Sequence, residues 1–486
     1  MPTRNVNTLL LAILVALLCY STHRRAKTAM IVGDALDLID RYYVDPVDRG
    51  ELLTAAMRGM TETLDRHSEY VPIDAYSSLQ DSINQEFTGI GILIEQPEEG
   101  QPVRVITPLV GSPAREAGLM PGDEIVEIEG RDVRDWDLVN VSKRLKGPIG
   151  TPVRIVVRRG GRRVPTRVIR SRIEMESVVG DHRQADDRWA YRLQDDPRIA
   201  YLRLTGFGER TVDELRKVLE TLDNRFDAMV VDLRGNSGGL LYAAVSVADM
   251  FLDSGRIVST RTRGGVIEEM FRAESGTLVD LDKPLAVLID GDSASASEIV
   301  AAALKDNGRA AIVGLRSYGK GTVQNILPLQ SGRSALRLTV ARYYRPNDQN
   351  IHRTDDATEE DDWGVRPSEG LEVSLDETVI DKLAERWRRS AYPLMDDAPT
   401  RAPENTDERE SGKSGEGAEN EPENSAGTAE TLPFDPAASG DGESTPEGKS
   451  IPDESESILD LDPQLRKAVE YLRGQIETRR PQATAA

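Results

Sequence analysis

The chain has 486 residues, of which 38% are hydrophobic and 30% charged, so it can hold two or three domains and a large core. Its formal net charge of −22 argues against a nucleic-acid partner. The only cysteine, Cys19, excludes an intramolecular disulfide and a cysteine-based zinc site.

The N-terminus has the composition of an export or anchoring segment. A run of 12 apolar residues from Leu9 to Tyr20 is short for a membrane span and typical of a signal-peptide core. No Ala-x-Ala cleavage site is clear, so an uncleaved membrane anchor formed by residues 9–20 also fits. The basic cluster His23–Lys27 opposes export, because it favours the cytoplasmic side. We expect a signal peptide or anchor over residues 1–28 and a location in the cell envelope or periplasm.

Residues 29–84 are predicted to be helical. Apolar residues recur at helical spacing in Ala35–Ile39 and again in Leu52–Met57, with Asp45-Pro46 as a break between them. We interpret this region as a packing or dimerisation domain, which allows a homo-oligomer.

Residues 85–175 change to short strands separated by glycine turns. A one-turn helix is predicted within 112–119 and an amphipathic helix over 136–145. This order predicts a small β-barrel capped by two helices. The predicted strands lie within Gly89–Ile94, Val103–Ile106, Glu124–Ile128 and Val153–Val157.

Residues 176–395 alternate strands and helices, which predicts an α/β layered core. Its last strands are expected at Val323–Leu327 and Ser334–Ala341. Residues 396–457 hold 18 acidic and 4 basic residues and almost no large apolar ones, so we predict a disordered acidic linker. In 458–486, Asp462-Pro463 begins an amphipathic helix that we expect to pack back on the core. The fold class is therefore α+β and multidomain.

A serine-rich turn carries the strongest chemical signal. Ser293, Ser295 and Ser297 lie between an apolar strand, Leu285–Ile289, and a helix, Ala296–Asp306. A serine at such a turn faces outward, and the helix N-terminus beside it favours developing negative charge. The pattern predicts a serine hydrolase, although it does not choose among the three hydroxyls.

A serine nucleophile needs a base. None of the four histidines, at positions 23, 67, 182 and 352, lies in a pattern of this kind, whereas Lys320 is flanked by glycines. A lysine acts as a base only when neutral, and desolvation can lower its usual pKa of about 10.4 by several units. Tight packing of the glycines, with Tyr318 and Val323 excluding water, is the arrangement we expect around Lys320.

The motif Ser-Ala-Ser-Ala-Ser-Glu at 293–298, with a lysine in Tyr-Gly-Lys-Gly, resembles the carboxy-terminal processing, or tail-specific, serine proteases. The resemblance implies a protease core layered like the ClpP and crotonase folds. It implies that Ser295 is the nucleophile, that Lys320, 25 residues later, is the base, and that Gln324 orients the lysine amine. It also implies a site role for Asp306, whose alternative is an ion pair with an arginine such as Arg309.

The same resemblance places an oxyanion hole beside the serine. One donor is expected to be the amide of Ala296 and the other that of Gly238 or Gly239. These glycines end the stretch Asp232–Gly239, where Ser237 stands in place of the family's proline and could loosen the loop.

The β-rich module resembles a PDZ domain, with further family marks at 111–119 and 121–125. The resemblance implies that a peptide C-terminus is captured as an added strand. The residues implied in peptide binding are Thr88, Gly89, Ile90, Gly91 and Ile92. His67 lies in a stretch that resembles a motif of the carboxy-terminal processing proteases, and it is expected to be structural.

These features predict an endopeptidase that binds protein C-termini and cleaves upstream, with no cofactor, no metal and no nucleic acid. One alternative is a catalytically inactive PDZ scaffold. A second alternative, acyl-CoA chemistry on the α/β core, lacks a recognisable nucleotide site.

Overall fold

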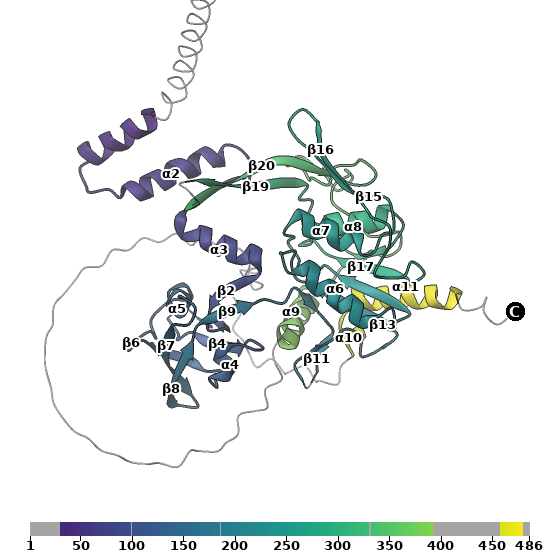
Figure 1. Ribbon diagram of the computed structural model, residues 1–486, viewed down its shortest axis with the longest axis horizontal. Coiled ribbons are helices and arrows are strands. Elements are labelled where there is room, and N and C mark those ends of the chain that lie inside the picture. The colour runs from purple at the N-terminus through teal and green to yellow at the C-terminus, as the bar shows by residue number, and fades with distance from the viewer. Residues whose placement is uncertain (1–29, 99, 185, 330–331, 392–456, 480–486) are drawn as a thin grey trace, which may run out of the picture. The chain divides into compact units, whose positions relative to one another are not determined.

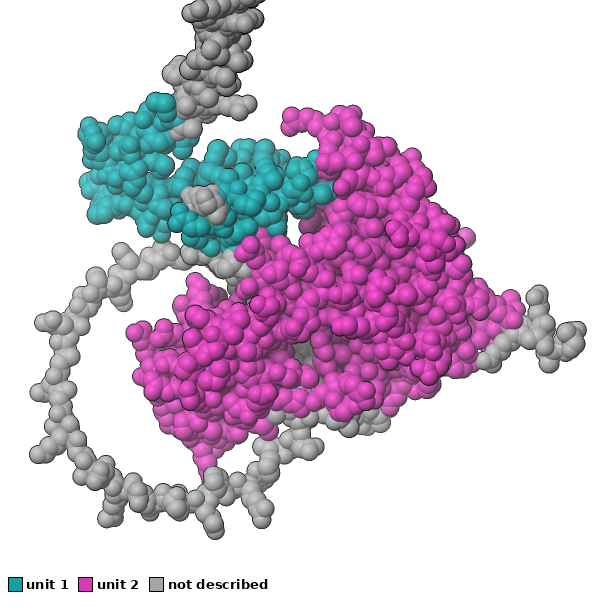
Figure 2. Space-filling view, viewed as in Figure 1, with its two compact units in different colours: residues 1–77, 323–340 teal, residues 78–322, 341–486 magenta. Residues whose placement is uncertain are grey.

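The computed structural model describes residues 30–98, 100–184, 186–329, 332–391 and 457–479. The predicted leader over 1–28 and the predicted acidic linker, apart from its last residue, lie outside these ranges. None of the helices within them is long and apolar enough to cross a membrane. The chain divides into two compact units, residues 1–77 with 323–340 and residues 78–322 with 341–486 (Figure 2).

The first unit contains the predicted N-terminal helices. One helix covers 30–42, and α2 (Arg49–Glu62) follows the predicted break at Asp45-Pro46. Asp48 caps α2, because its carboxylate accepts hydrogen bonds from the amides of Gly50 and Glu51. Strand β1 (Glu69–Val71) pairs antiparallel with the first part of β20 (Ser334–Tyr344), which also pairs with β19 (Thr322–Leu329).

The second unit begins with the PDZ-like module, entered through α3 (Ile73–Asn84). Its main sheet has the order β3-β4-β5-β7-β8, with β6 (Arg131–Asp132) on β5, and β2 (Glu86–Gly89) pairs separately with β9 (Ser171–Glu174). The predicted helices are present as α4 (Pro113–Glu116) and α5 (Leu138–Leu145). The remaining strands are β3 (Ile92–Glu95), β4 (Arg104–Pro108), β5 (Glu124–Ile128), β7 (Pro152–Arg159) and β8 (Arg162–Ile169).

The α/β core of this unit is a five-stranded sheet with the order β10-β13-β14-β17-β18. Its strands are parallel except β10 (Val178–Val179), and every residue of β14 and β17 is buried, as expected for central parallel strands covered on both faces. The parallel strands are β13 (Ile199–Leu204), β14 (Ala228–Asp232), β17 (Leu285–Ile289) and β18 (Ala311–Gly314).

Helices and smaller strands surround this sheet (Figure 1). Helices α6 (Thr211–Leu222), α7 (Leu241–Asp249) and α8 (Ala296–Asp306) follow β13, β14 and β17 in the chain. Strand β15 (Arg256–Arg261) pairs with β16 (Ile267–Arg272) and with the last part of β20. The other elements are β11 (His182–Arg183), β12 (Trp189–Ala190) and α9 (Glu377–Ala391).

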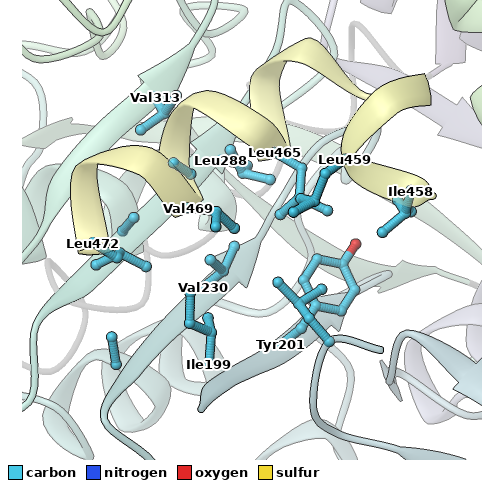
Figure 3. Close-up of a cluster of buried hydrophobic side chains, with 14 of the residues drawn as sticks. Ile199, Tyr201, Val230, Leu288, Val313, Ile458, Leu459, Leu465, Val469 and Leu472 are labelled. Atoms are coloured by element: carbon cyan, nitrogen blue, oxygen red, sulfur yellow. The ribbon is translucent and has the colours of Figure 1, made fainter. Parts of the chain in front are cut away.

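The C-terminal segment packs on the sheet, as predicted. Helices α10 (Ile458–Leu461) and α11 (Pro463–Arg479) bury apolar side chains against alternate residues of the parallel strands (Figure 3). Alternation puts Val230 and Leu288 in this cluster, whereas their chain neighbours point to the opposite face. The helix contributes Leu465, Ala468, Val469, Leu472 and Ile476.

A buried ionic network joins this C-terminal segment to the end of β14. Arg234 is 1% exposed and donates to Asp232 at 2.6 Å, to Asp462 at 2.8 Å and to Gln464 at 3.1 Å. Tyr201 donates to the same Asp232 carboxylate at 2.7 Å. Burial disfavours the guanidinium, but the two carboxylates outweigh burial and raise the pKa of Arg234 well above its usual value.

We predict that Asp462→Ala lowers the free energy of unfolding by about 3 kcal/mol, because it leaves a buried arginine with half of its counter-charge. Chemical denaturation of the full chain measures the effect. Asp460→Ala is the matched control, since this aspartate is exposed on the adjoining helix α10. Equal stability of the two variants would contradict the role assigned to the network.

Candidate active site

The serine-rich turn is fastened by two of its three hydroxyls. Ser293 donates to the carbonyl oxygen of Leu233 at 2.9 Å, and Ser297 donates to that of Asn236 at 2.8 Å. Both side chains are fully buried, so their hydroxyls hold the turn against the loop that follows β14. This use of Ser293 and Ser297 leaves Ser295 as the hydroxyl with a different environment.

Ser295 has a strained backbone at the start of α8. Its φ of 55° and ψ of −111° lie outside the regions that non-glycine residues ordinarily adopt. The residue is 7% exposed, and its amide donates to Oε2 of Glu298 at 2.8 Å. The turn therefore orients Ser295 through its backbone.

Glu298 is a fully buried carboxylate that links the serine turn, residues 293–297, to the lysine loop, residues 317–320. Besides Ser295, its oxygens accept the amides of Gly319 at 2.7 Å and Lys320 at 2.8 Å, and the hydroxyl of Ser317 at 2.6 Å. Burial raises the pKa of Glu298, while these four hydrogen bonds oppose the rise. One oxygen atom, Oε2, bonds the amides of both Ser295 and Lys320, so the two backbones lie side by side.

The lysine loop is fixed on its other side as well. The Ser317 hydroxyl accepts the amide of Val365 at 2.7 Å, and the Tyr318 amide donates to the carbonyl of Ser293 at 3.0 Å. Lys320 itself is half-buried. The Tyr318 side chain is 40% exposed, and its expected part in excluding water from Lys320 stays a prediction.

The loop after β14 lies against the serine turn. Gly238 has a φ of 107°, and a Cβ atom there would lie 2.8 Å from the Cβ of Ser295. Gly239 has a φ of 144°, and a Cβ there would lie 2.2 Å from the carbonyl oxygen of Phe207. Both positions therefore require glycine.

Asn236 holds this loop in place. It is fully buried, donates to the carbonyl of Leu204 at 2.8 Å, and accepts the amide of Gly238 at 2.9 Å. Its own carbonyl accepts Ser297, as above. Ser237, which stands where the family has a proline, is exposed. The residue that anchors the loop is its neighbour, Asn236. Because the amide of Gly238 is used within the loop, Gly239 is the better of the two predicted oxyanion donors.

Asp306 and Arg309, which the sequence suggested as a possible ion pair, are each bonded to other groups. Asp306, at the far end of α8 from Ser295, forms an ion pair with Arg345 at 2.5 Å. Arg309, the partner expected from the sequence, instead donates to the carbonyls of Phe251 and Lys283. Eleven residues of helix separate Ser295 from Asp306, about 16 Å, so the structure does not bring this aspartate to the serine.

Gln324 and His67 belong to the first compact unit. The amide nitrogen of Gln324 lies 3.3 Å from the hydroxyl of Thr339, which donates to Asp65. The backbone amide of His67 donates to the same aspartate at 2.8 Å. The role of Gln324 toward Lys320 stays a prediction.

The predicted peptide-binding loop connects β2 to β3. Thr88 and Gly89 end β2, and Ile92 begins β3, which is an edge strand of its sheet. The carbonyls of Ile90 and Gly91 accept the amides of Ala114 and Leu109 at 2.9 and 3.0 Å. Since a trans peptide points its N–H opposite to its C=O, the amides of Gly91 and Ile92 face away from these donors. An edge strand with such a loop can accept a terminal carboxylate and an added strand.

Sequence reasoning missed Glu298. Glu298 stands three residues after Ser295, and this Ser-x-x-Glu spacing is the signature of a capping box, which could have drawn attention to it.

Comparison with known proteins gives the family. The sequence model of Peptidase family S41 matches residues 198–367, and that of a PDZ domain matches 104–159. The chain is 39% identical over 326 residues to a carboxy-terminal-processing protease of Bartonella bacilliformis, covering 66% of this chain and 71% of that protein. It is 33% identical over 342 residues to a carboxyl-terminal-processing protease of Synechocystis, covering 70% and 75% respectively.

A layered α/β core with a serine turn and an attached PDZ domain defines a serine peptidase. Within that class the chain belongs to family S41, the carboxy-terminal processing proteases. The predicted family, fold class and enzyme class are thereby confirmed.

We predict that Glu298→Gln lowers both stability and turnover. The glutamine amide would oppose backbone donors that now meet a carboxylate, and one unsatisfied buried donor costs about 2 kcal/mol. Thermal unfolding and steady-state proteolysis measure the two effects.

Asp306→Asn is the control for this prediction, because it weakens an ion pair at the opposite end of the same helix. We expect a lower melting temperature with kcat within about twofold of the parent enzyme, since stability terms far from the reacting atoms leave transition-state contacts unchanged. A larger loss of kcat in Asp306→Asn than in Glu298→Gln would contradict the placement of both carboxylates.

Proposed function

We propose that this protein grips the free C-terminus of a protein substrate at its PDZ domain and cleaves the chain upstream with a Ser295–Lys320 dyad. The observation that carries the dyad is the position of Glu298, one oxygen of which accepts the backbone amides of both residues at 2.8 Å. The strained φ of Ser295 supports the same assignment, because such strain is concentrated at functional sites.

In the proposed acylation step, Ser295 Oγ attacks the peptide carbonyl carbon while its proton passes to Lys320 Nζ. The carbonyl electron pair moves to oxygen, and the amides of Ala296 and Gly239 stabilise the resulting oxyanion. Lys320 then gives the proton to the leaving amine. A water molecule, deprotonated by the same lysine, releases the acyl group and restores the serine.

We predict that Ser295→Ala and Lys320→Ala each lower cleavage of a protein with a frayed apolar tail by more than about 10³-fold, because each removes a group that takes part in bond formation. The rate of substrate loss on a gel measures it. Ser297→Ala is the control among the rival serines, since its hydroxyl is used to hold Asn236. Cleavage that persists in Ser295→Ala and disappears in a folded Ser297→Ala would assign the nucleophile to Ser297.

Recognition of the C-terminus is proposed to use the loop of residues 88–92. We predict that amidating the last residue of a substrate raises KM about tenfold and leaves kcat unchanged, because a charge-assisted hydrogen bond is lost in binding. A pair of glycine variants tests the location of this effect.

Gly91→Ala should produce the same loss with a free carboxylate, since a Cβ there would lie 2.4 Å from Ser112. Gly122→Ala is matched to it, because Gly122 has a similar φ, 81° against 77°, but open space around its Cβ position. Equal KM values for amidated and free substrates would refute recognition of the carboxylate.

The cellular setting is proposed from the leader sequence. The apolar run of residues 9–20 supports export to the cell envelope, with the run either removed or kept as an anchor. A homo-oligomer formed through the N-terminal helices stays a prediction from the sequence.

A further inference from the structure

The loop that follows β14 begins with a tight turn. The amide of Asn236 donates to the carbonyl of Leu233 at 3.2 Å, which closes a four-residue turn with Arg234 and Gly235 at its centre. The φ of Gly235 is 67°, whereas that of Arg234 is negative. This combination is a type II turn, whose third position favours glycine.

Glycine alone does not decide which way the central peptide of this turn points. Turning over the peptide between Arg234 and Gly235 would give a type I turn, in which the third residue has a negative φ. Glycine adopts positive and negative φ about equally readily. The observed orientation therefore depends on groups outside the turn.

Two oppositely charged side chains bind the two ends of this peptide. Arg203, on β13, donates from Nη2 to the carbonyl oxygen of Arg234 at 3.2 Å. Asp290, directly after β17, accepts the amide of Gly235 at 3.0 Å with each of its carboxylate oxygens. In the opposite orientation the peptide carbonyl would face the carboxylate and its N–H the guanidinium, so both contacts would become unfavourable.

Each of these side chains is itself held by further contacts. The indole ring centre of Trp387, on α9, lies 3.3 Å from the guanidinium carbon of Arg203. Asp290 also accepts the amides of Asp292 and Ser293 at 3.1 and 3.0 Å, so it connects the turn to the segment that enters α8. Burial raises the pKa of Asp290, and the hydrogen bond from the turn opposes the rise, so this bond favours the charged form.

We propose that Arg203 and Asp290 are positioning residues, which hold the central peptide of the turn in its type II orientation and so direct the loop of residues 236–239 against Ser295. This inference rests on the proposed function, in which the amide of Gly239 stabilises the oxyanion. Neither side chain takes part in a bond-making step, because each acts through the loop.

Asp290→Asn tests the contact with the peptide N–H. With its oxygen in the place of Oδ1, asparagine still accepts the amides of Asp292 and Ser293, but its NH2 group opposes the N–H of Gly235. In the full chain, with a protein substrate that ends in an unstructured apolar tail, we expect kcat to fall about tenfold and KM to stay unchanged. The reason is that an oxyanion donor is displaced while the binding of the substrate tail is kept.

Asp292→Asn is the matched control, because it makes the same chemical change two residues away on an exposed side chain. We expect its kcat to stay within about twofold of the parent. Parental kcat in Asp290→Asn, a loss that falls on KM alone, or an equal loss of kcat in Asp292→Asn would each overturn the inference.

Arg203→Met tests the other end of the same peptide and serves alone if Asp290→Asn does not fold. We expect a similar fall in kcat with KM unchanged, and parental kcat would overturn the inference. In the double variant the two losses should combine to less than their product, because both side chains act on one peptide. A loss equal to the product would show independent roles and would also overturn it.

The same measurements separate this inference from the proposed dyad. Activity that persists in Ser295→Ala and in Lys320→Ala would refute the dyad. Inactivity of both, together with parental kcat in Asp290→Asn and Arg203→Met, would refute only the positioning role.

Discussion

The geometry of the site depends on one buried carboxylate. Glu298 is fully buried, and such a group is tolerated only when hydrogen bonds replace the water it has lost. Its four donors come from Ser295 and from three residues of the segment 317–320. Satisfying the carboxylate therefore requires the serine turn and the lysine loop to be in contact. The same interaction that makes Glu298 tolerable in the core brings the two proposed catalytic residues together.

The C-terminal segment helps to hold the loop after β14, which lies against Ser295. Arg234 directly precedes the segment 235–239, and its guanidinium is held by Asp232 from the same strand end and by Asp462 from the start of α11. Because each of these groups is buried, removing one leaves an uncompensated charge. Residues more than two hundred positions apart thus determine where the loop after β14 begins. Helix α11 therefore supports the candidate site as well as contributing to the hydrophobic core.

Much of the fold could be predicted from local sequence, whereas less of the candidate site could. The strand Leu285–Ile289 and the helix Ala296–Asp306 have the predicted bounds, because a continuous apolar run and a small-residue turn mark them. The local pattern alone did not choose among the three serines; the family resemblance implied Ser295. The partners that set Ser293 and Ser297 apart are carbonyls about sixty residues away, which no local pattern indicates. The ion pair of Asp306 with Arg345 likewise joins residues 39 positions apart, which no local pattern indicates.

The environment of Ser295, the proposed nucleophile, explains how the turn can keep its strained backbone. A φ of 55° on a residue with a side chain costs about 1–3 kcal/mol, and it persists only where neighbouring contacts fix it. Here the amide of Ser295 is bonded to Glu298, and the serines on either side are fastened to the loop after β14. The turn therefore holds the backbone of the proposed nucleophile rigidly, which is what a positioned reacting group requires.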